Sequence, residues 1–117
     1  MDRQALGRWG EDLAVRHLQA QGLEVLDRNW RCRDGELDVV ARDGGALVFV
    51  EVKARSGLGY GEPAEAVSPA KARRIRVLAA QWLAEQRPAG RWDLRFDVVS
   101  VLRTRDLPQV QHLRGAF

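Results

Sequence analysis

The central stretch of the chain reads Gly35-Glu36-Leu37-Asp38-Val39-Val40-Ala41-Arg42-Asp43-Gly44-Gly45-Ala46-Leu47-Val48-Phe49-Val50-Glu51-Val52-Lys53. Two apolar runs flank a glycine pair, which favours the positive φ angles of a tight turn, so this stretch predicts a β-hairpin. Charged side chains interrupt the runs at Glu36, Asp38, Glu51 and Lys53. A charge inside an apolar strand is costly unless it is paired or binds a metal, so these residues are the first candidates for a site.

The length of the turn decides whether these charges share a face of the hairpin. Side chains alternate between the two faces of a strand, so a two-residue loop, Asp43-Gly44 or Gly44-Gly45, places Asp38, Glu51 and Lys53 together. Asp38 and Glu51 are then opposite or diagonal neighbours, with Cβ atoms about 4.5 to 8 Å apart. A three-residue loop would put them on opposite faces, and the functional interpretation would fail.

The composition indicates one globular domain, residues 1–117. The chain is 45% hydrophobic and 30% charged, and its length allows a substantial core. The single cysteine, Cys32, can form neither an internal disulfide nor a cysteine-based zinc site, which favours a reducing compartment. We find no signal segment and no run of ~18 apolar residues, so we expect a cytoplasmic protein without membrane contact.

Apolar periodicity and breakers predict the elements. Helices are expected at residues 3–21 and from Ser68-Pro69 to just before Pro88, with strands at residues 23–30, 36–41, 46–54, 92–102 and 108–113. Residues 29–34 are expected to be a polar connection, and residues 57–61 a glycine-rich loop without an assigned role. This order is typical of an α/β domain with three layers and a mixed sheet, in which the second helix is a parallel crossover.

The first predicted helix carries a carboxylate at the edge of its apolar face. Leu6, Leu13 and His17 are expected near the middle of that face, and His17 is expected to be a core histidine. Glu11 falls at the boundary, where it can look into a cleft or remain a solvated helix charge. Asp97 is expected to be a structural partner for an arginine, and His112 receives no role.

Basic residues follow directly on the carboxylate-bearing stretch, although the net charge of +3 is by itself mild. The six basic residues in this segment are Lys53, Arg55, Lys71, Arg73, Arg74 and Arg76. The last four crowd the start of the second helix, where cations oppose the helix dipole and a bound phosphate would offset that cost. A solvated helix face is the alternative.

Asp38, Glu51 and Lys53 together suggest phosphate chemistry. Two carboxylates this close repel each other, and a divalent cation removes the conflict. Oxygen ligands without usable cysteine favour Mg²⁺ or Mn²⁺ over zinc. Such a metal polarises a phosphate and acidifies a bound water, while Lys53 is expected to orient that water or to stabilise developing charge.

Asp38, followed after twelve residues by Glu51-Val52-Lys53, resembles the PD-(D/E)xK nuclease motif, with Leu37 where the motif's name has proline. The wider sequence resembles the YraN-like family of small bacterial proteins, which are predicted nucleases. The matching segments are Gly7…Gly10-Glu11-Asp12-Leu13-Ala14, Asn29-Trp30-Arg31, Gly35-Glu36-Leu37-Asp38-Val39-Val40, Val48-Phe49-Val50-Glu51-Val52-Lys53, Ala66-Val67, Lys71, Arg74-Ile75 and Phe96-Asp97-Val98-Val99.

That family resembles archaeal Holliday-junction resolvases, which implies a restriction-endonuclease-like fold with an α-β-β-β-α-β core. The resemblance implies that Asp38, Glu51 and Glu11 bind Mg²⁺ or Mn²⁺ and that Lys53 is the catalytic lysine. The residues expected to hold DNA phosphates without reading bases are Arg55, Lys71, Arg73, Arg74 and Arg76. Relatives that cut junctions work as dimers, so a homodimer is implied as well.

Three functions are open at this point. The first is a metal-dependent endonuclease acting on DNA, with branched or structured DNA as one candidate substrate. The second is a nucleic-acid-binding module that keeps the scaffold without turnover. The third is a small α/β protein in which Glu36, Asp38, Glu51, Lys53 and Arg55 form only an ion-pair cluster.

Overall fold

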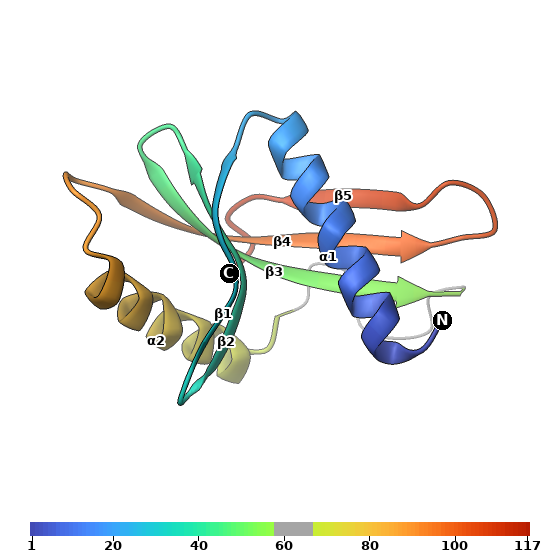
Figure 1. Cartoon of the computed structure of the whole chain (residues 1–117), viewed down its shortest axis with the longest axis horizontal. Helices are drawn as coiled ribbons and strands as arrows, with labels where there is room; N and C mark the ends of the chain where they lie inside the picture. The colour runs from blue at the N-terminus through green and yellow to red at the C-terminus, as the bar shows by residue number, and fades with distance from the viewer. Residues whose placement is uncertain (58–66) are drawn as a thin grey trace.

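A computed structural model of the chain describes residues 1–57 and 67–117 (Figure 1). Its elements are α1 (Arg3–Ala20), β1 (Glu24–Cys32), β2 (Gly35–Asp43), β3 (Ala46–Ser56), α2 (Pro69–Gln86), β4 (Asp93–Arg103) and β5 (Gln109–Leu113). The expected loop at residues 57–61 lies, after Gly57, outside the described residues. Within the described ranges, no helix is long and apolar enough to cross a membrane.

The five strands form one mixed sheet in the order β1-β2-β3-β4-β5. Neighbouring strands are antiparallel except for β3 and β4, which run parallel from the Ala46–Asp93 pair to the Ser56–Arg103 pair. The chain reaches β4 from β3 by way of α2, so the predicted parallel crossover is confirmed. Figure 1 shows β1 and β2 curving away from the other strands toward α2.

The two helices cover opposite faces of the sheet. Val48 and Val50 of β3 pack in a core cluster with residues of α1, whereas Leu47 and Phe49 pack in a second cluster with residues of α2. Because side chains alternate along a strand, these two sets point to opposite faces. The predicted three-layer α/β architecture is therefore confirmed, with β3 covered on both sides.

The turn between β2 and β3 has two residues, Gly44 and Gly45. Asp43 pairs with Ala46, and Gly44 has a φ of 56°, which glycine adopts without strain. The even-length turn on which the functional interpretation depends is thus present. Val40 accordingly pairs with Phe49, and both pack beneath α2.

The expected polar connection at residues 29–34 is wrong. β1 continues to Cys32 and β2 begins at Gly35, so only Arg33 and Asp34 connect them. Most residues of this segment are polar, but Trp30 and Cys32 pack against the core cluster beneath α2. A short two-stranded ribbon therefore replaces the expected loop.

The buried side of α1 also differs from the expectation. Its buried residues are Gly10, Ala14, Val15 and Leu18, and the predicted centre of the face, Leu6, Leu13 and His17, is only half-buried. Gly10 is the reason: a Cβ atom built on it would lie 2.5 Å from the Cβ of Ala54. The helix therefore crosses β3 in close contact at Gly10. A prediction from the spacing of apolar side chains does not include this glycine, because glycine has no side chain.

Asp97 is the structural partner of an arginine, as predicted. Its buried carboxylate accepts hydrogen bonds from the Arg95 guanidinium (2.9 Å), the Gly115 amide (2.9 Å) and His112 Nε2 (2.7 Å). Burial by itself would raise the pKa of Asp97, but these hydrogen bonds outweigh it and lower the pKa to about 2. His112 thus has a structural role that its sequence position did not reveal.

Candidate functional site

The site lies where the sheet forks. β2 and β3 pair as far as Val39 and Val50 and then separate, β2 continuing with β1 and β3 with β4. Beyond the fork, the Val52 amide donates a hydrogen bond to Asp38 Oδ2 at 2.9 Å. The Asp38 carboxylate therefore takes the place of a backbone acceptor and is held against β3.

The alternation of β2 breaks at the same residue. Leu37 and Val40 both pack beneath α2, although residues three apart in a regular strand face opposite sides. On the neighbouring strand, Asn29 lies between the residues that pair with Leu37 and Val39, and it has a φ of 52°. Asparagine tolerates this left-handed conformation better than most residues. Asp38 thus lies between Leu37, which packs beneath α2, and Val39, which packs beneath α1.

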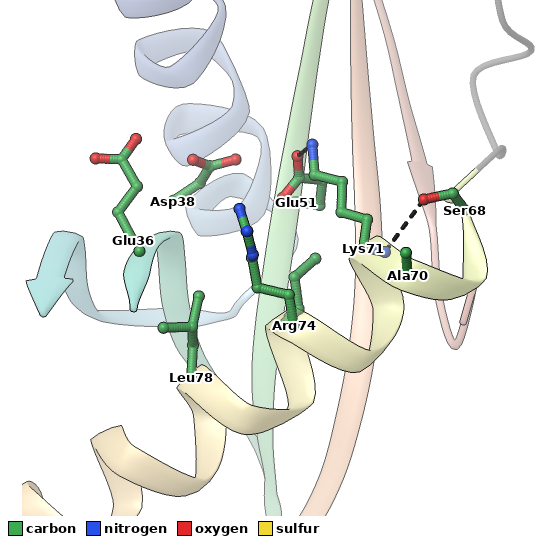
Figure 2. Close-up of a pocket in the computed structure, with 10 residues that line it drawn as sticks. Glu36, Asp38, Glu51, Ser68, Ala70, Lys71, Arg74 and Leu78 are labelled. Atoms are coloured by element: carbon green, nitrogen blue, oxygen red, sulfur yellow. Dashed lines mark hydrogen bonds and ion pairs between the residues drawn. The ribbon is translucent and has the colours of Figure 1, made fainter. Parts of the chain in front are cut away.

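A first cavity of about 610 Å³, here called the α2 pocket, brings carboxylates and cations together. Its charged lining residues are Glu36, Asp38, Glu51, Lys71 and Arg74. The Glu51 side chain is only 13% exposed and forms an ion pair with the Lys71 ammonium. Figure 2 shows the Arg74 guanidinium pointing toward the carboxylates of Asp38 and Glu51.

The start of α2 is fixed by its cap. Ser68 Oγ accepts a hydrogen bond from the Lys71 amide at 3.1 Å, and Pro69 occupies the first turn, as predicted. Ile75 and Leu78 of the same helix are buried against the sheet. Lys71 and Arg74 precede these anchors by one turn, so they face the pocket.

A second cavity of about 620 Å³, here called the α1 pocket, opens on the other side of Asp38. It shares Glu36 and Asp38 with the first cavity. Its further charged and amide side chains are Arg3, Gln4, Arg8, Glu11, Asn29 and Arg31. Asp38 therefore stands between two polar pockets, one beside the start of each helix.

Glu11 lines the α1 pocket, so this boundary carboxylate looks into a cleft. Its side chain is 12% exposed, and Oε1 accepts hydrogen bonds from Arg28 Nη2 at 3.0 Å and Asn29 Nδ2 at 2.8 Å. The same Arg28 nitrogen contacts Asp12 Oδ1 at 2.7 Å. β1 thus fixes the carboxylate that α1 carries.

The electrostatics single out Asp38. Burial, followed by the nearby charge of Glu51, raises the pKa of Asp38 to about 7, although the hydrogen bond from Val52 works in the opposite direction. The charges of Glu11 and Glu36 raise this pKa further. A cation between the carboxylates would relieve this repulsion.

The donor set suits a hard cation that keeps part of its water. Mg²⁺ is usually held by one or two carboxylates, water and substrate oxygens, and Asp38 and Glu51 supply two carboxylates to one pocket. Within residues 1–57 and 67–117, no three His, Cys, Asp or Glu side chains form a metal site among themselves. The predicted set of Asp38, Glu51 and Glu11 is thus not assembled as a closed cage.

The other predicted site residues are spread more widely. Lys53 is half-buried on β3 beside Ser100 of β4 and does not line either pocket, and Arg55 lies two residues further on. Arg73 is exposed. The Arg76 guanidinium lies 4.2 Å from the ring centroid of Phe96. Of the five predicted phosphate-binding residues, Lys71 and Arg74 line the α2 pocket together with the carboxylates.

Two carboxylates of the expected ion-pair cluster pair with cations from other elements. Glu36 pairs with Arg31, which lies directly opposite on β1, at 2.9 Å, and Glu51 pairs with Lys71 of α2. Both cations come from outside the set of Lys53 and Arg55 that the third interpretation assumed. The carboxylates are therefore tied to elements on either side of the fork.

Sequence reasoning missed the residues that support Glu11 and the basic side of the α1 pocket. Asn29 belongs to the Asn29-Trp30-Arg31 segment that matches the family, and this match was a signal of a role in the site. Arg28 carries no such signal, because its contact with Glu11 exists only once α1 lies across β1. Arg3 and Arg8 likewise resemble any solvated helix charge until the pocket is seen.

Comparison with known proteins identifies the family. Residues 10–101, which include Glu11, Asp38, Glu51 and Lys53, match the model of the uncharacterised protein family UPF0102. UPF0102 proteins of Frankia casuarinae and Beutenbergia cavernae are 60% and 59% identical, and the aligned regions cover 98% and 97% of this chain and 98% and 96% of the relatives. A UPF0102 protein of Acidothermus cellulolyticus is 53% identical over 98% of this chain and 95% of its own. The chain therefore belongs to the UPF0102 family, the YraN-like family that its sequence resembles.

Proposed function

We propose that this protein is a metal-dependent endonuclease that hydrolyses phosphodiester bonds in DNA. The observation that carries the proposal is the α2 pocket, in which the carboxylates of Asp38 and Glu51 lie with Lys71 and Arg74. Carboxylates can hold a divalent cation, and the basic side chains can hold the phosphate to be cut. The mixed sheet between two helices supports a restriction-endonuclease-like fold for this site.

Asp38 and Glu51 would hold Mg²⁺ or Mn²⁺, and Glu11 would contribute from the α1 side. When bound, such a metal polarises a phosphoryl oxygen and generates a nucleophilic water near neutral pH. The Val52 amide keeps Asp38 in position for this task, because it fixes one carboxylate oxygen and leaves the other available. Burial and the charges of Glu51, Glu11 and Glu36 raise the pKa of Asp38, and those neighbouring charges would also attract a cation to it.

Lys71 and Arg74 would bind the non-bridging oxygens of the phosphate. Arg74 offers a planar fork of donors that suits phosphate geometry, and Lys71 offers a compact positive charge. Lys53 would orient the attacking water or stabilise developing charge, which requires its amino group to reach the pocket from β3. We propose DNA rather than RNA as the substrate; location in the cytoplasm and homodimer formation stay predictions.

The Lys71–Glu51 ion pair links substrate and metal. Without either, the Lys71 ammonium is the counter-ion of Glu51. A phosphate that attracts Lys71 removes this counter-ion, which raises the affinity of Glu51 for a cation. Phosphate and divalent metal should therefore increase each other's affinity, as thermodynamic linkage requires.

A second function is favoured by the same contacts. Lys71 engages Glu51, and Arg28 and Asn29 engage Glu11, so two of the three predicted ligand carboxylates already have partners. A protein in which these partners stay in place would bind nucleic acid without cutting it. Turnover distinguishes the two functions.

The test is a panel of labelled substrates. Four-way junctions, flaps, linear duplexes, single-stranded DNA and matched RNA are incubated with the protein in Mg²⁺, in Mn²⁺ and in EDTA. Cleavage of DNA that needs the divalent ion supports the endonuclease. Salt-dependent binding without any cleavage supports the binding module instead, and an absence of both overturns the two functions.

A further inference from the structure

The two pockets share one wall and differ in their basic residues. Glu36 and Asp38 line both of them, the α2 pocket adds Lys71 and Arg74, and the α1 pocket adds Arg3, Arg8 and Arg31. Residues from segments far apart in the sequence thus place cations around one carboxylate. The proposed function uses Glu11 of the α1 pocket but, of the basic residues that line the two pockets, only Lys71 and Arg74 of the α2 pocket.

The acidic residues of the α1 pocket are largely compensated inside the protein. Glu11 is paired with Arg28, and Glu36 is paired with Arg31 across the β1–β2 ribbon. The remaining acid, Asp38, lines both pockets and is the predicted metal ligand. Apart from Asp38, which would be occupied by the metal, the pocket therefore has no carboxylate left among its described lining residues to neutralise further cations.

Arg3 and Arg8 are the cations in question. Their side chains form no ion pair and no hydrogen bond with any residue in the described ranges 1–57 and 67–117. The first turn of α1 holds no acidic residue either. Two exposed guanidinium groups that line the same cavity as Asp38 are thus available to an external anion.

The shape of the site suggests a strand rather than a small anion. Each cavity has a volume of about 600 Å³, and they meet at Asp38, so a ligand that fills one extends naturally into the other. Consecutive phosphates of a nucleic acid supply repeated negative charges along such a path. Gln4 and Asn29 add neutral hydrogen-bonding groups to the α1 side, which suit phosphate and sugar oxygens.

We propose that Arg3 and Arg8 of α1, with Arg31 of β1, form a second backbone-phosphate subsite, so that one nucleic acid strand spans both pockets and crosses Asp38. This inference rests on the proposed function and adds the path of the substrate to it. Arg3 and Arg8 position the strand on one side of the cut, and Lys71 and Arg74 hold it at and beyond the cut. Contacts of this kind set affinity and register but do not read sequence.

The first test measures binding in EDTA. Fluorescence anisotropy with a labelled duplex, over a range of salt concentrations, compares wild type with Arg3→Gln/Arg8→Gln, with Lys71→Gln/Arg74→Gln and with the control Arg16→Gln/Arg91→Gln. The control removes two exposed arginines that line neither pocket. Each lost phosphate contact should reduce the magnitude of the slope of log affinity against log salt concentration by ~0.9. The slope of Arg3→Gln/Arg8→Gln should therefore be smaller than that of wild type by ~1.8. The slope of the control should change only by the small effect of its lower net charge. Thermal unfolding confirms that each variant is folded.

The second test locates the contact on the strand. Methylphosphonate linkages remove the charge of phosphates on one side of the mapped cut. With wild type, neutral linkages on the α1 side should weaken binding; with Arg3→Gln/Arg8→Gln they should have little further effect, because the same contact is already lost. Additive losses in this cycle would overturn the subsite.

The outcomes separate this inference from the proposed function. If Arg3→Gln/Arg8→Gln binds like the control while Lys71→Gln/Arg74→Gln loses affinity, the second subsite is wrong and the endonuclease stands. If wild type neither binds nor cuts nucleic acid, both are wrong. Loss of affinity in both double variants, with the control unchanged, supports a strand that spans the two pockets.

Discussion

Asp38 is the residue whose environment is least favourable to its charge. Burial and the charge of Glu51 raise its pKa to about 7, and within the described residues its one hydrogen bond comes from the Val52 amide. Glu51, by contrast, has a cationic partner in Lys71. A carboxylate kept at a cost to folding is the usual signature of a site that trades stability for activity.

Replacing Asp38 by asparagine should stabilise the metal-free protein at pH 8. The folded-state pKa lies above the ordinary value, so the folded state holds its proton between about pH 4 and 7 while the unfolded state releases it, and wild-type stability falls as pH rises through this window. Asp38→Asn lacks this titration and can still accept the Val52 hydrogen bond. Urea unfolding in EDTA from about pH 4.5 to 8 measures the free energy of unfolding of both proteins. An equal dependence of that free energy on pH in wild type and Asp38→Asn would contradict this account.

With a divalent metal, wild type should become more stable than Asp38→Asn. Mn²⁺ at 100 times its dissociation constant stabilises a protein that binds it only when folded by about 2.7 kcal/mol. We expect this gain in wild type and its loss in Asp38→Asn, as measured by thermal unfolding with and without Mn²⁺. The control is Asp106→Asn, at an exposed position that lines neither pocket and should keep the full gain.

Asp97 should show the opposite dependence on pH. Its pKa is lowered to about 2, so its carboxylate contributes stability above about pH 4, and this contribution is lost as pH falls toward 2. Asp97→Asn removes the buried charge to which Arg95, His112 and the Gly115 amide donate. It leaves Arg95 with Asp43 as its ion-pair partner and should cost ~3 kcal/mol at pH 7. In urea unfolding, the difference in free energy of unfolding between wild type and Asp97→Asn should decrease from pH 5 to pH 2. A difference that stays constant would show that packing, and not charge, is responsible.

At the scale of elements, the position of Glu11 depends on the contact between α1 and β3. The helix approaches the strand at Gly10, where a Cβ atom would lie 2.5 Å from the Cβ of Ala54. Glu11 is the next residue and lines the α1 pocket. A single glycine thus sets both the helix packing and the direction in which the carboxylate points.

Gly10→Ala should therefore destabilise the protein, by about 1–3 kcal/mol, because neither backbone can withdraw easily. Gly7→Ala on the same helix is the matched control: nothing lies within 4 Å of its added Cβ, and it should gain up to about 1 kcal/mol from helix propensity. Urea unfolding measures both. Ala54→Gly should restore much of the loss in Gly10→Ala, and no recovery in that double variant would contradict the proposed contact.

Local patterns predicted most elements, since helix caps, the Gly44-Gly45 turn and apolar alternation are encoded by neighbouring residues. Contacts between distant segments were not predictable in this way. Arg28 meets Glu11, and Arg31 pairs with Glu36, only because α1 and β1 are placed by the whole fold. The left-handed backbone at Asn29, and the packing of Leu37 and Val40 on one face, also depart from the simple alternation on which the predicted site depends.

At the scale of the whole molecule, the site follows from the fork in the sheet. β2 leaves β3 with β1, and the starts of α1 and α2 supply basic residues to the pockets on either side of Asp38. The sequence predicted the carboxylates and the basic group at the start of α2. The second became visible only when the N-terminal turns of α1 were seen beside the same aspartate.

The most direct measurement is the rate of DNA cleavage in Mg²⁺ by wild type, Asp38→Asn, Glu51→Gln and the control Glu85→Gln, which changes an exposed carboxylate of α2 that lines neither pocket. We predict that the first two variants lose ~100-fold or more in rate while still binding DNA, because each removes a metal ligand and neither removes a phosphate contact. Glu85→Gln should cut like wild type. Cleavage that survives in Asp38→Asn and Glu51→Gln would contradict the assignment of these two carboxylates as the catalytic metal site.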